Sequence, residues 1–235
     1  MNKLISIFIL AATLAAQAQS PLLRNDFTTN SFNALTYGAR FVDAAFGNNS
    51  YSGTVGKPWA TIYYAQTNAP TGSAIYVSPG TYPAELTRGD VVWYLARGAV
   101  LTNALRVVYP DTGTNIIIRG EGDLKSAGYT IQLGDGNGAD IQARYIYGFA
   151  KSLEISTGVG RARLKISGAH IRGDLYAETF DQEPECLFLN CVLYGSDAGM
   201  TCDFSVSGST STANAANAKR TGSWVINTNL LTAPQ

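Results

Sequence analysis

One pattern recurs along the chain, as Ile116-Ile-Ile-Arg-Gly, Ile141-Gln-Ala-Arg-Tyr, Leu164-Lys-Ile-Ser-Gly, Leu187-Phe-Leu-Asn-Cys and Trp224-Val-Ile-Asn-Thr. Each segment begins with an apolar residue, a variable residue, a second apolar residue and a polar residue. The steps between the segments are 25, 23, 23 and 37 residues. Period-two alternation interrupted by turn residues is typical of a β-strand. The segments therefore predict one strand in each of several similar repeats.

Two further strand signals accompany these segments. A β-rich pair follows four of them, at Tyr145-Ile, His170-Ile, Val192-Leu and Leu230-Leu. Another apolar alternation appears later in each repeat, at Thr130-Ile-Gln-Leu, Leu153-Glu-Ile-Ser, Leu175-Tyr-Ala and Cys202-Asp-Phe-Ser-Val. No apolar spacing of 3.6 residues runs through these segments, which disfavours helical repeats. Each repeat is therefore predicted to be one coil of a solenoid, with its strands paired in parallel to the coils above and below.

The predicted fold class is all-β, a right-handed parallel β-helix of about six coils with an N-terminal helical cap. We predict the β-helix over residues 58–235, after an N-terminal segment 19–57. The cap is the stretch from Pro58 to Ala69, read as a short helix with Pro58 in its first turn and with Trp59, Ile62 and Tyr63 on one face. Residues 208–220 are small, polar and of low complexity, and predict a flexible insertion.

The N-terminal part also carries a family resemblance. Lys57-Pro-Trp-Ala-Thr-Ile and Ile75-Tyr-Val-Ser-Pro-Gly-Thr-Tyr, preceded by Phe41-Val-Asp, resemble the opening of pectin-lyase-like right-handed β-helix proteins. Trp93-Tyr-Leu-Ala-Arg-Gly-Ala-Val-Leu is similar to the next coil of many bacterial surface proteins and phage tail proteins. The resemblance implies a helix-capped β-helix over about residues 40 to 230. It does not imply one activity, because the superfamily includes lyases, hydrolases, adhesins and non-catalytic fibres.

The first residues predict export from the cytoplasm. Lys3 precedes an apolar run from Leu4 to Ala16, and Ala16-Gln-Ala is a cleavage site of small residues. The run is shorter than the ~20 residues that cross a bilayer. We therefore expect residues 1–18 to be a signal peptide, no membrane span, and a secreted or cell-surface protein. An uncleaved anchor or a buried N-terminal helix is the alternative.

The composition of the chain limits the kinds of partner and cofactor that it is expected to bind. Only 14% of the residues are charged, and Lys plus Arg equal Asp plus Glu at 17 each, so no basic field favours nucleic acid. The three cysteines, Cys186, Cys191 and Cys202, leave at least one thiol without an intrachain disulfide. Cys202 could pair with either of the others, or all three could be buried small apolar residues. No spacing resembles a zinc site, and we predict neither a metal nor a cofactor.

Enzyme motifs of the superfamily are missing from the chain. Galacturonan hydrolases of the fold use neighbouring aspartates and a Gly-His-Gly element, but this chain has no Asp-Asp pair, and its one histidine, His170, lies in Gly168-Ala-His-Ile. We interpret His170 as a corner or stack residue. Asp181, Glu183 and Glu185 could bind calcium, although a solvated loop explains them as well. The sequence thus favours a protein with no catalytic residues.

A binding face follows from the alignment of the repeats. If the first and third positions of each segment face the core, the second and fourth face solvent. We predict a glycan-binding face from these outward positions, formed by Arg119, Gln142, Arg144, Lys165, Phe188 and Asn190. Stacked arginines suit carboxylate or sulfate groups, and Phe188 could stack on a sugar ring. The alternative is an ordinary solvated face in which Glu121 or Asp140 neutralises the arginines.

The leading functional prediction is non-catalytic binding of a polysaccharide or cell-surface glycan along a stacked strand face. The second hypothesis is a phage tail-fibre or virion component that binds a host envelope as a homotrimer, and cleavage after Ala18 would argue against it. The third is a small polysaccharide lyase, against which the missing acid pairs and calcium ligands count.

Overall fold

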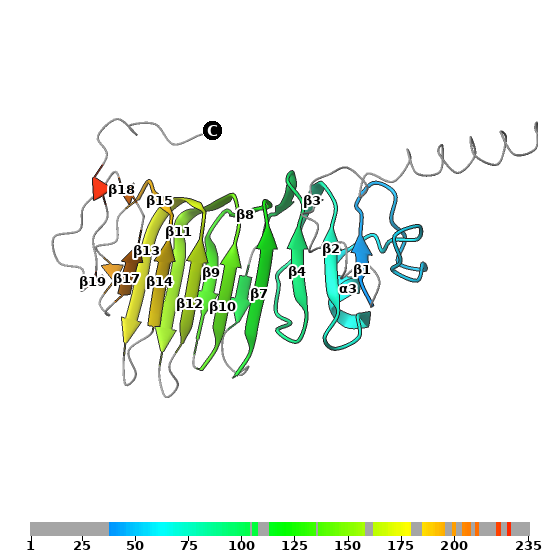
Figure 1. Ribbon diagram of the computed structural model, residues 1–235, viewed down its shortest axis with the longest axis horizontal. Coiled ribbons are helices and arrows are strands. Elements are labelled where there is room, and N and C mark those ends of the chain that lie inside the picture. The colour runs from blue at the N-terminus through cyan, green and yellow to red at the C-terminus, as the bar shows by residue number, and fades with distance from the viewer. Residues whose placement is uncertain are drawn as a thin grey trace, which may run out of the picture.

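The chain folds as a parallel β-solenoid. The computed structural model describes residues 38–103, 105–107, 113–134, 136–157, 162–179 and 185–195, and the backbone of 199–200, 204–207, 210–211, 220–221 and 225–226. Every strand pair between named strands in this part of the chain is parallel, and the inner strands of each ladder pair with strands of the coils before and after them. Figure 1 shows these strands side by side in one long row, from β1 at one end to β17 and β19 at the other. The predicted all-β fold class is confirmed.

The first sheet forms one face of the solenoid. It has nine strands in the described residues, in the order β1 (Arg40–Val42), β2 (Ala74–Val77), β4 (Val92–Leu95), β7 (Asn115–Gly120), β10 (Gly138–Gln142), β12 (Arg163–Ser167), β14 (Glu185–Leu189), β17 (Phe204–Ser207) and β19 (Arg220–Thr221). The number of coils therefore differs from the expected six or so. The five aligned segments begin at residue 116, and β1, β2 and β4 of this sheet precede that residue.

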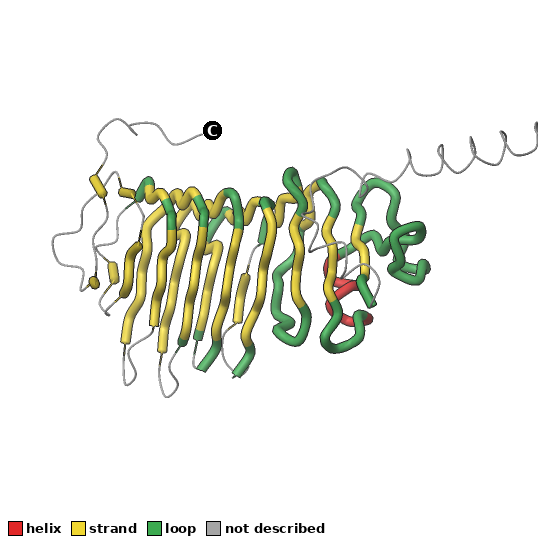
Figure 2. The backbone as a smooth tube through the Cα atoms, viewed as in Figure 1, coloured by secondary structure: helices red, strands yellow, loops and turns green. Residues whose placement is uncertain are grey.

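The second sheet bends around the other side of the solenoid (Figure 2). Its main ladder contains β3 (Gly80–Tyr82), β5 (Ala99–Leu101), β8 (Asp123–Ser126), β11 (Tyr145–Thr157), β13 (His170–Thr179), β15 (Val192–Leu193), β18 (Thr210–Ser211) and β20 (Val225–Ile226). A branch adds β6 (Leu105–Val107), β9 (Tyr129–Leu133) and β16 (Gly199–Met200). The long strands β11 and β13 turn a corner, because their first halves continue the β8 ladder and their second halves continue the β9 ladder.

One apolar core runs through the coils. The first sheet contributes pairs such as Ile116 and Ile118, the main ladder contributes Ile146 and Ile171, and the branch contributes Ile131, all of them buried. Each fully buried aliphatic side chain stabilises the fold by roughly 1.5–3 kcal/mol. Stacking of equivalent side chains from coil to coil therefore holds the solenoid together.

The register of the second sheet agrees with the sequence prediction. Tyr145-Ile pairs with His170-Ile, which pairs with Val192-Leu, as the repeat predicts. Leu153-Glu-Ile also pairs with Leu175-Tyr-Ala as expected. Two other segments were assigned to the wrong sheet. Phe204–Ser207 lies in the first sheet beside β14, and Val225–Ile226, from the Trp224 segment, lies in the second sheet beside β18. Leu230 and Leu231 lie outside the described residues.

The register of the first sheet differs from the sequence alignment. Ile141 pairs with Ile118 and Ile166 instead of Ile116 and Leu164, a shift of two residues that keeps the same face inward. Between β12 and β14 the shift is one residue, since Ile166 pairs with Phe188. A shift of one moves every side chain to the opposite face of the sheet. The predicted outward position of Phe188 is therefore wrong.

A short helix lies beside β1 at the N-terminal end of the row (Figure 1). This helix, α3 (Ile62–Asn68), begins after Thr61, whose side chain accepts a hydrogen bond from the backbone of Tyr64. The predicted start at Pro58 is thus too early. Trp59 is buried ahead of the helix, and Tyr63 is 76% exposed and does not share the inward face of Ile62. No helix in the described residues is long and apolar enough to cross a membrane.

Several sequence predictions fall largely outside the described residues. The predicted signal peptide is one of them, since residues 1–37 are not described. Most of the predicted insertion 208–220 is another, although β18 lies within it. The strand β1 lies in the predicted N-terminal segment 19–57 and already pairs with β2. Cys186 and Cys191 are buried, and Cys202 is not described.

Gly120, at the end of β7, is expected to tolerate no side chain. Its φ is +106°, and a Cβ there would lie 2.2 Å from the carbonyl oxygen of Leu95 in the preceding coil. We expect Gly120→Ala to lower the free energy of unfolding by about 2–4 kcal/mol, because the backbone is strained and the two coils must move apart. Chemical denaturation measures the effect. Gly128→Ala is the control, since a Cβ at Gly128 meets nothing within 4 Å. Equal stabilities of the two variants would contradict the close coil contact.

Candidate binding groove on the second sheet

Outward side chains of the second sheet form two parallel rows. Along each strand a core residue, such as Leu124 or Ile146, separates two outward residues, because successive side chains of a strand point to opposite faces. One row contains Asp123, Tyr145, His170 and Val192, which are register partners on successive strands. The other contains Lys125, Tyr147 and Arg172, followed by Tyr194 just beyond β15. The repeat thus places aromatic and basic side chains at constant spacing on one face.

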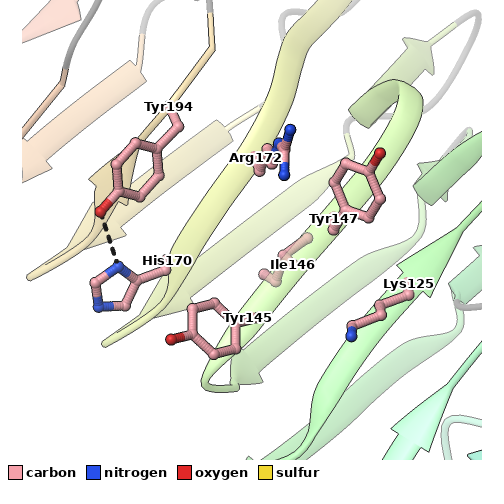
Figure 3. Close-up of a pocket in the computed structure, with 7 residues that line it drawn as sticks. All are labelled: Lys125, Tyr145, Ile146, Tyr147, His170, Arg172 and Tyr194. Atoms are coloured by element: carbon pink, nitrogen blue, oxygen red, sulfur yellow. Dashed lines mark hydrogen bonds between the residues drawn. The ribbon is translucent and has the colours of Figure 1, made fainter. Parts of the chain in front are cut away.

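These side chains line a groove of about 200 Å³. Figure 3 shows it with Tyr145 and His170 along one side and Lys125, Tyr147 and Arg172 along the other, while the Tyr194 ring is directed from the second row toward His170. The groove residues are therefore Lys125, Tyr145, Ile146, Tyr147, His170, Arg172 and Tyr194. Arg172 and Lys125 are exposed, and the four rings are half-buried, so that each ring is held by the sheet while part of it faces solvent.

The rings contact one another along the solenoid axis. The ring centres of Tyr145 and His170 are 5.3 Å apart, and those of His170 and Tyr194 are 6.0 Å apart with their planes within 14° of parallel. The Tyr194 hydroxyl and Nδ1 of His170 share a hydrogen bond of 3.4 Å, in which the imidazole tautomer decides the donor (Figure 3). The interpretation of His170 as a stack residue agrees with this geometry.

A buried carboxylate fixes one end of this aromatic row. The guanidinium of Arg144 donates to both oxygens of Asp123, at 2.9 and 2.7 Å, and its central carbon lies 4.8 Å from the Tyr145 ring centre. Hydrogen bonding by Asp123, whose side chain is 4% exposed, raises the pKa of Arg144 above its ordinary value. Bidentate pairing of this kind sets orientation as well as charge. Asp123 and Arg144 therefore hold Tyr145 in place and neutralise each other.

The sequence-predicted glycan face is divided between two sheets. Arg119, Gln142 and Lys165 lie on the outer side of the first sheet, as predicted. Arg144 follows the end of β10 at the corner and turns to Asp123 of the second sheet, so it does not stack above Arg119. Asn190 is exposed at the corner after β14, with a φ of 52°.

Two charged residues of the predicted glycan face, both on the first sheet, are already paired. Arg119 donates to the Asp140 carboxylate at 2.8 Å, and the Lys165 ammonium lies 3.5 Å from the same oxygen. This is the neutralisation by Asp140 that the sequence left as an alternative. Phe188 is 0% exposed in the core and offers no ring to a sugar. At the predicted positions the first sheet therefore presents paired charges and no exposed phenylalanine ring.

Sequence reasoning missed most of the groove. It identified the strand pairs that contain Tyr145 and His170 but did not follow the outward positions on both sides of each core residue. The triplets Asp123-Leu-Lys, Tyr145-Ile-Tyr, His170-Ile-Arg and Val192-Leu-Tyr carry that signal. Aligned in register, they give a column of tyrosine, histidine and basic residues.

The remaining candidate for a functional site is the acidic loop that the sequence identified as a possible calcium site. Within the described ranges, no group of three or more His, Cys, Asp or Glu side chains is placed to hold a metal ion. Glu185, the described member of the predicted acidic loop, lies 3.4 Å from Arg163 in an exposed ion pair. Asp181 and Glu183 lie outside the described residues. The groove therefore presents aromatic rings, hydroxyl groups and two cationic side chains, all of which can contact a bound ligand.

The similarity of this chain to known proteins is low. No protein-family description and no curated protein matches the sequence. Among solved structures, a rhamnogalacturonan lyase matches at 13% identity and a TM-score of 0.42, over 80% of this chain. The chain spans 61% of the length of that lyase. The parallel ladders and the core that continues from coil to coil show that the chain is a parallel β-helix.

Proposed function

We propose that the chain binds polysaccharide in the groove of the second sheet and does not cleave it. The observation that carries this proposal is the set of contacting rings of Tyr145, His170 and Tyr194 beside Tyr147, Lys125 and Arg172. Tyrosine combines an apolar ring with a hydroxyl, which suits the mixed apolar and polar surface of a sugar. The basic residues add charge at one side of the groove.

The geometry of the solenoid favours an extended ligand. Successive strands lie ~4.8 Å apart, so equivalent side chains repeat at that step along the axis. An extended polysaccharide also presents similar units at a regular step, and it could contact the same kind of side chain on several coils. A small molecule would use only one part of this row. We propose export after Ala18 as the context of this binding, since polysaccharides are accessible outside the cytoplasm.

Retention on immobilised polysaccharides tests the proposal. Purified residues 19–235 are passed over neutral, uronate-bearing and sulfated polymers, with calcium or with chelator, while absorbance of unsaturated products is followed. We expect retention of at least one polymer, independent of calcium, without product. Failure to bind any polymer would refute the binding function. Calcium-dependent release of unsaturated sugars would replace it with a lyase activity.

A further inference from the structure

The basic residues of the groove are separated by one aromatic residue. Lys125, Tyr147 and Arg172 are register partners on β8, β11 and β13. Because adjacent strands lie ~4.8 Å apart, the backbone positions of Lys125 and Arg172 are roughly 9.6 Å apart along the axis. Figure 3 shows the Tyr147 ring between the two basic side chains. The row therefore alternates cation, ring and cation at one residue per strand.

Both cations are available to a ligand. Among the described residues, neither Lys125 nor Arg172 forms an ion pair, and both are exposed. The guanidinium carbon of Arg172 lies 5.2 Å from the Tyr147 ring centre, an arrangement that leaves its N–H groups able to donate outward. Asp123, the carboxylate nearest in the neighbouring row, is already bound by Arg144. An anion in the groove would thus meet two uncompensated charges.

We propose that the groove selects polysaccharides that carry one anionic group on every second sugar. This inference rests on the proposed function and concerns the same site. One strand step is close to the advance of one sugar along an extended chain, so two steps correspond to a disaccharide. Anionic groups on alternate sugars would then face Lys125 and Arg172. The uncharged sugar between them would pack against the ring and hydroxyl of Tyr147.

A polysaccharide with an anionic group on every sugar fits the groove less well. An anion on every sugar would also place a carboxylate or sulfate against Tyr147, where the ring replaces water and no cation of that row is directly opposite. Removing an ion from water without a paired partner is unfavourable. The third anion therefore adds no affinity. Carboxylate and sulfate ester share the required chemistry, since arginine binds both through paired N–H groups.

Four polymers and one pair of double variants test this inference. The polymers are hyaluronan fragments with a carboxylate on alternate sugars, carboxyl-reduced hyaluronan with none, polyglucuronate with one on every sugar, and carboxyl-reduced chondroitin sulfate with sulfate alone on alternate sugars. We expect hyaluronan or the sulfated polymer to bind about tenfold more tightly than carboxyl-reduced hyaluronan, and polyglucuronate to bind no more tightly than hyaluronan. Comparison of the carboxylate and sulfate polymers identifies the anion.

Lys125→Gln/Arg172→Gln is expected to remove the tenfold preference and most of the salt dependence of binding. Lys57→Gln/Arg97→Gln, which removes two exposed charges outside the groove, is the matched control and should retain both. Equal binding of hyaluronan and its carboxyl-reduced form would overturn the charge inference and leave the binding function in place. Tighter binding of polyglucuronate would overturn the spacing. Failure of all four polymers, together with the wider panel, would overturn the binding function itself.

Discussion

Tyr147→Ala/Tyr194→Ala is expected to weaken polysaccharide binding by about 30-fold to 100-fold. Each tyrosine contributes roughly 1–1.5 kcal/mol through its ring beyond the area it buries, and every 1.4 kcal/mol is a factor of ten in affinity. The two rings come from β11 and from the residue just beyond β15, with β13 between them (Figure 3), so one polymer chain that follows the groove would contact both. Titration calorimetry with the polymer retained most strongly by the intact chain measures the loss.

Two further variants distinguish the loss of tyrosine contacts with the polymer from a general effect on the protein. Tyr51→Ala/Tyr63→Ala removes two exposed tyrosines outside the groove and should leave the affinity unchanged. Tyr194→Phe keeps the ring but loses the hydrogen bond to Nδ1 of His170, and we expect a loss of only about threefold, since a hydrogen bond of this kind contributes ~0.5–1.5 kcal/mol. Unchanged affinity of the groove double variant, with a native melting transition, would exclude the groove as the binding site.

The repeat predicted the second sheet better than the first for a physical reason. In the main ladder of the second sheet, polar, basic or aromatic residues flank the single core residues Leu124, Ile146 and Ile171, so only one face can be buried. In β14 the run Cys186-Leu-Phe-Leu is apolar at every position. Period-two alternation is then lost, and either set of alternate residues could face the core. The choice depends on pairing with Ile166 of the preceding strand, which a single sequence does not contain.

The candidate site was misplaced for a related reason. The prediction put Arg119 and Arg144 on neighbouring coils of one face because both are the fourth residue of similar segments. The strand β10 ends at Gln142, however, and the corner that follows turns Arg144 toward the second sheet. Where a strand ends depends on how the coil closes, in this case through the hydrogen bond from the Arg144 backbone to Gly122. The repeat therefore predicts which segments are strands, whereas the positions of the corners depend on the three-dimensional packing of the coils.

Phe188→Ala is expected to lower the free energy of unfolding by about 3–5 kcal/mol. Phe188 is fully buried and pairs with Ile166 in the centre of the first sheet, so truncation leaves a cavity in a core that continues into the next coil. A phenylalanine on a solvent-facing glycan site, as the sequence alignment predicted, would lose binding on truncation and little stability. Denaturant titration followed by tryptophan fluorescence measures the change.

Leu187→Ala is the control that tests the register of β14. Leu187 is half-buried on the outward face of the same strand, opposite Lys165, and its truncation should cost about 1 kcal/mol or less. The two residues are adjacent in sequence and differ mainly in the face they occupy, so the comparison isolates that face. If Leu187→Ala were the more destabilising variant, β14 would be displaced by one residue from a register in which Phe188 pairs with Ile166. Phe188 would then face solvent beside Lys165, and the binding face would have to be sought on the first sheet.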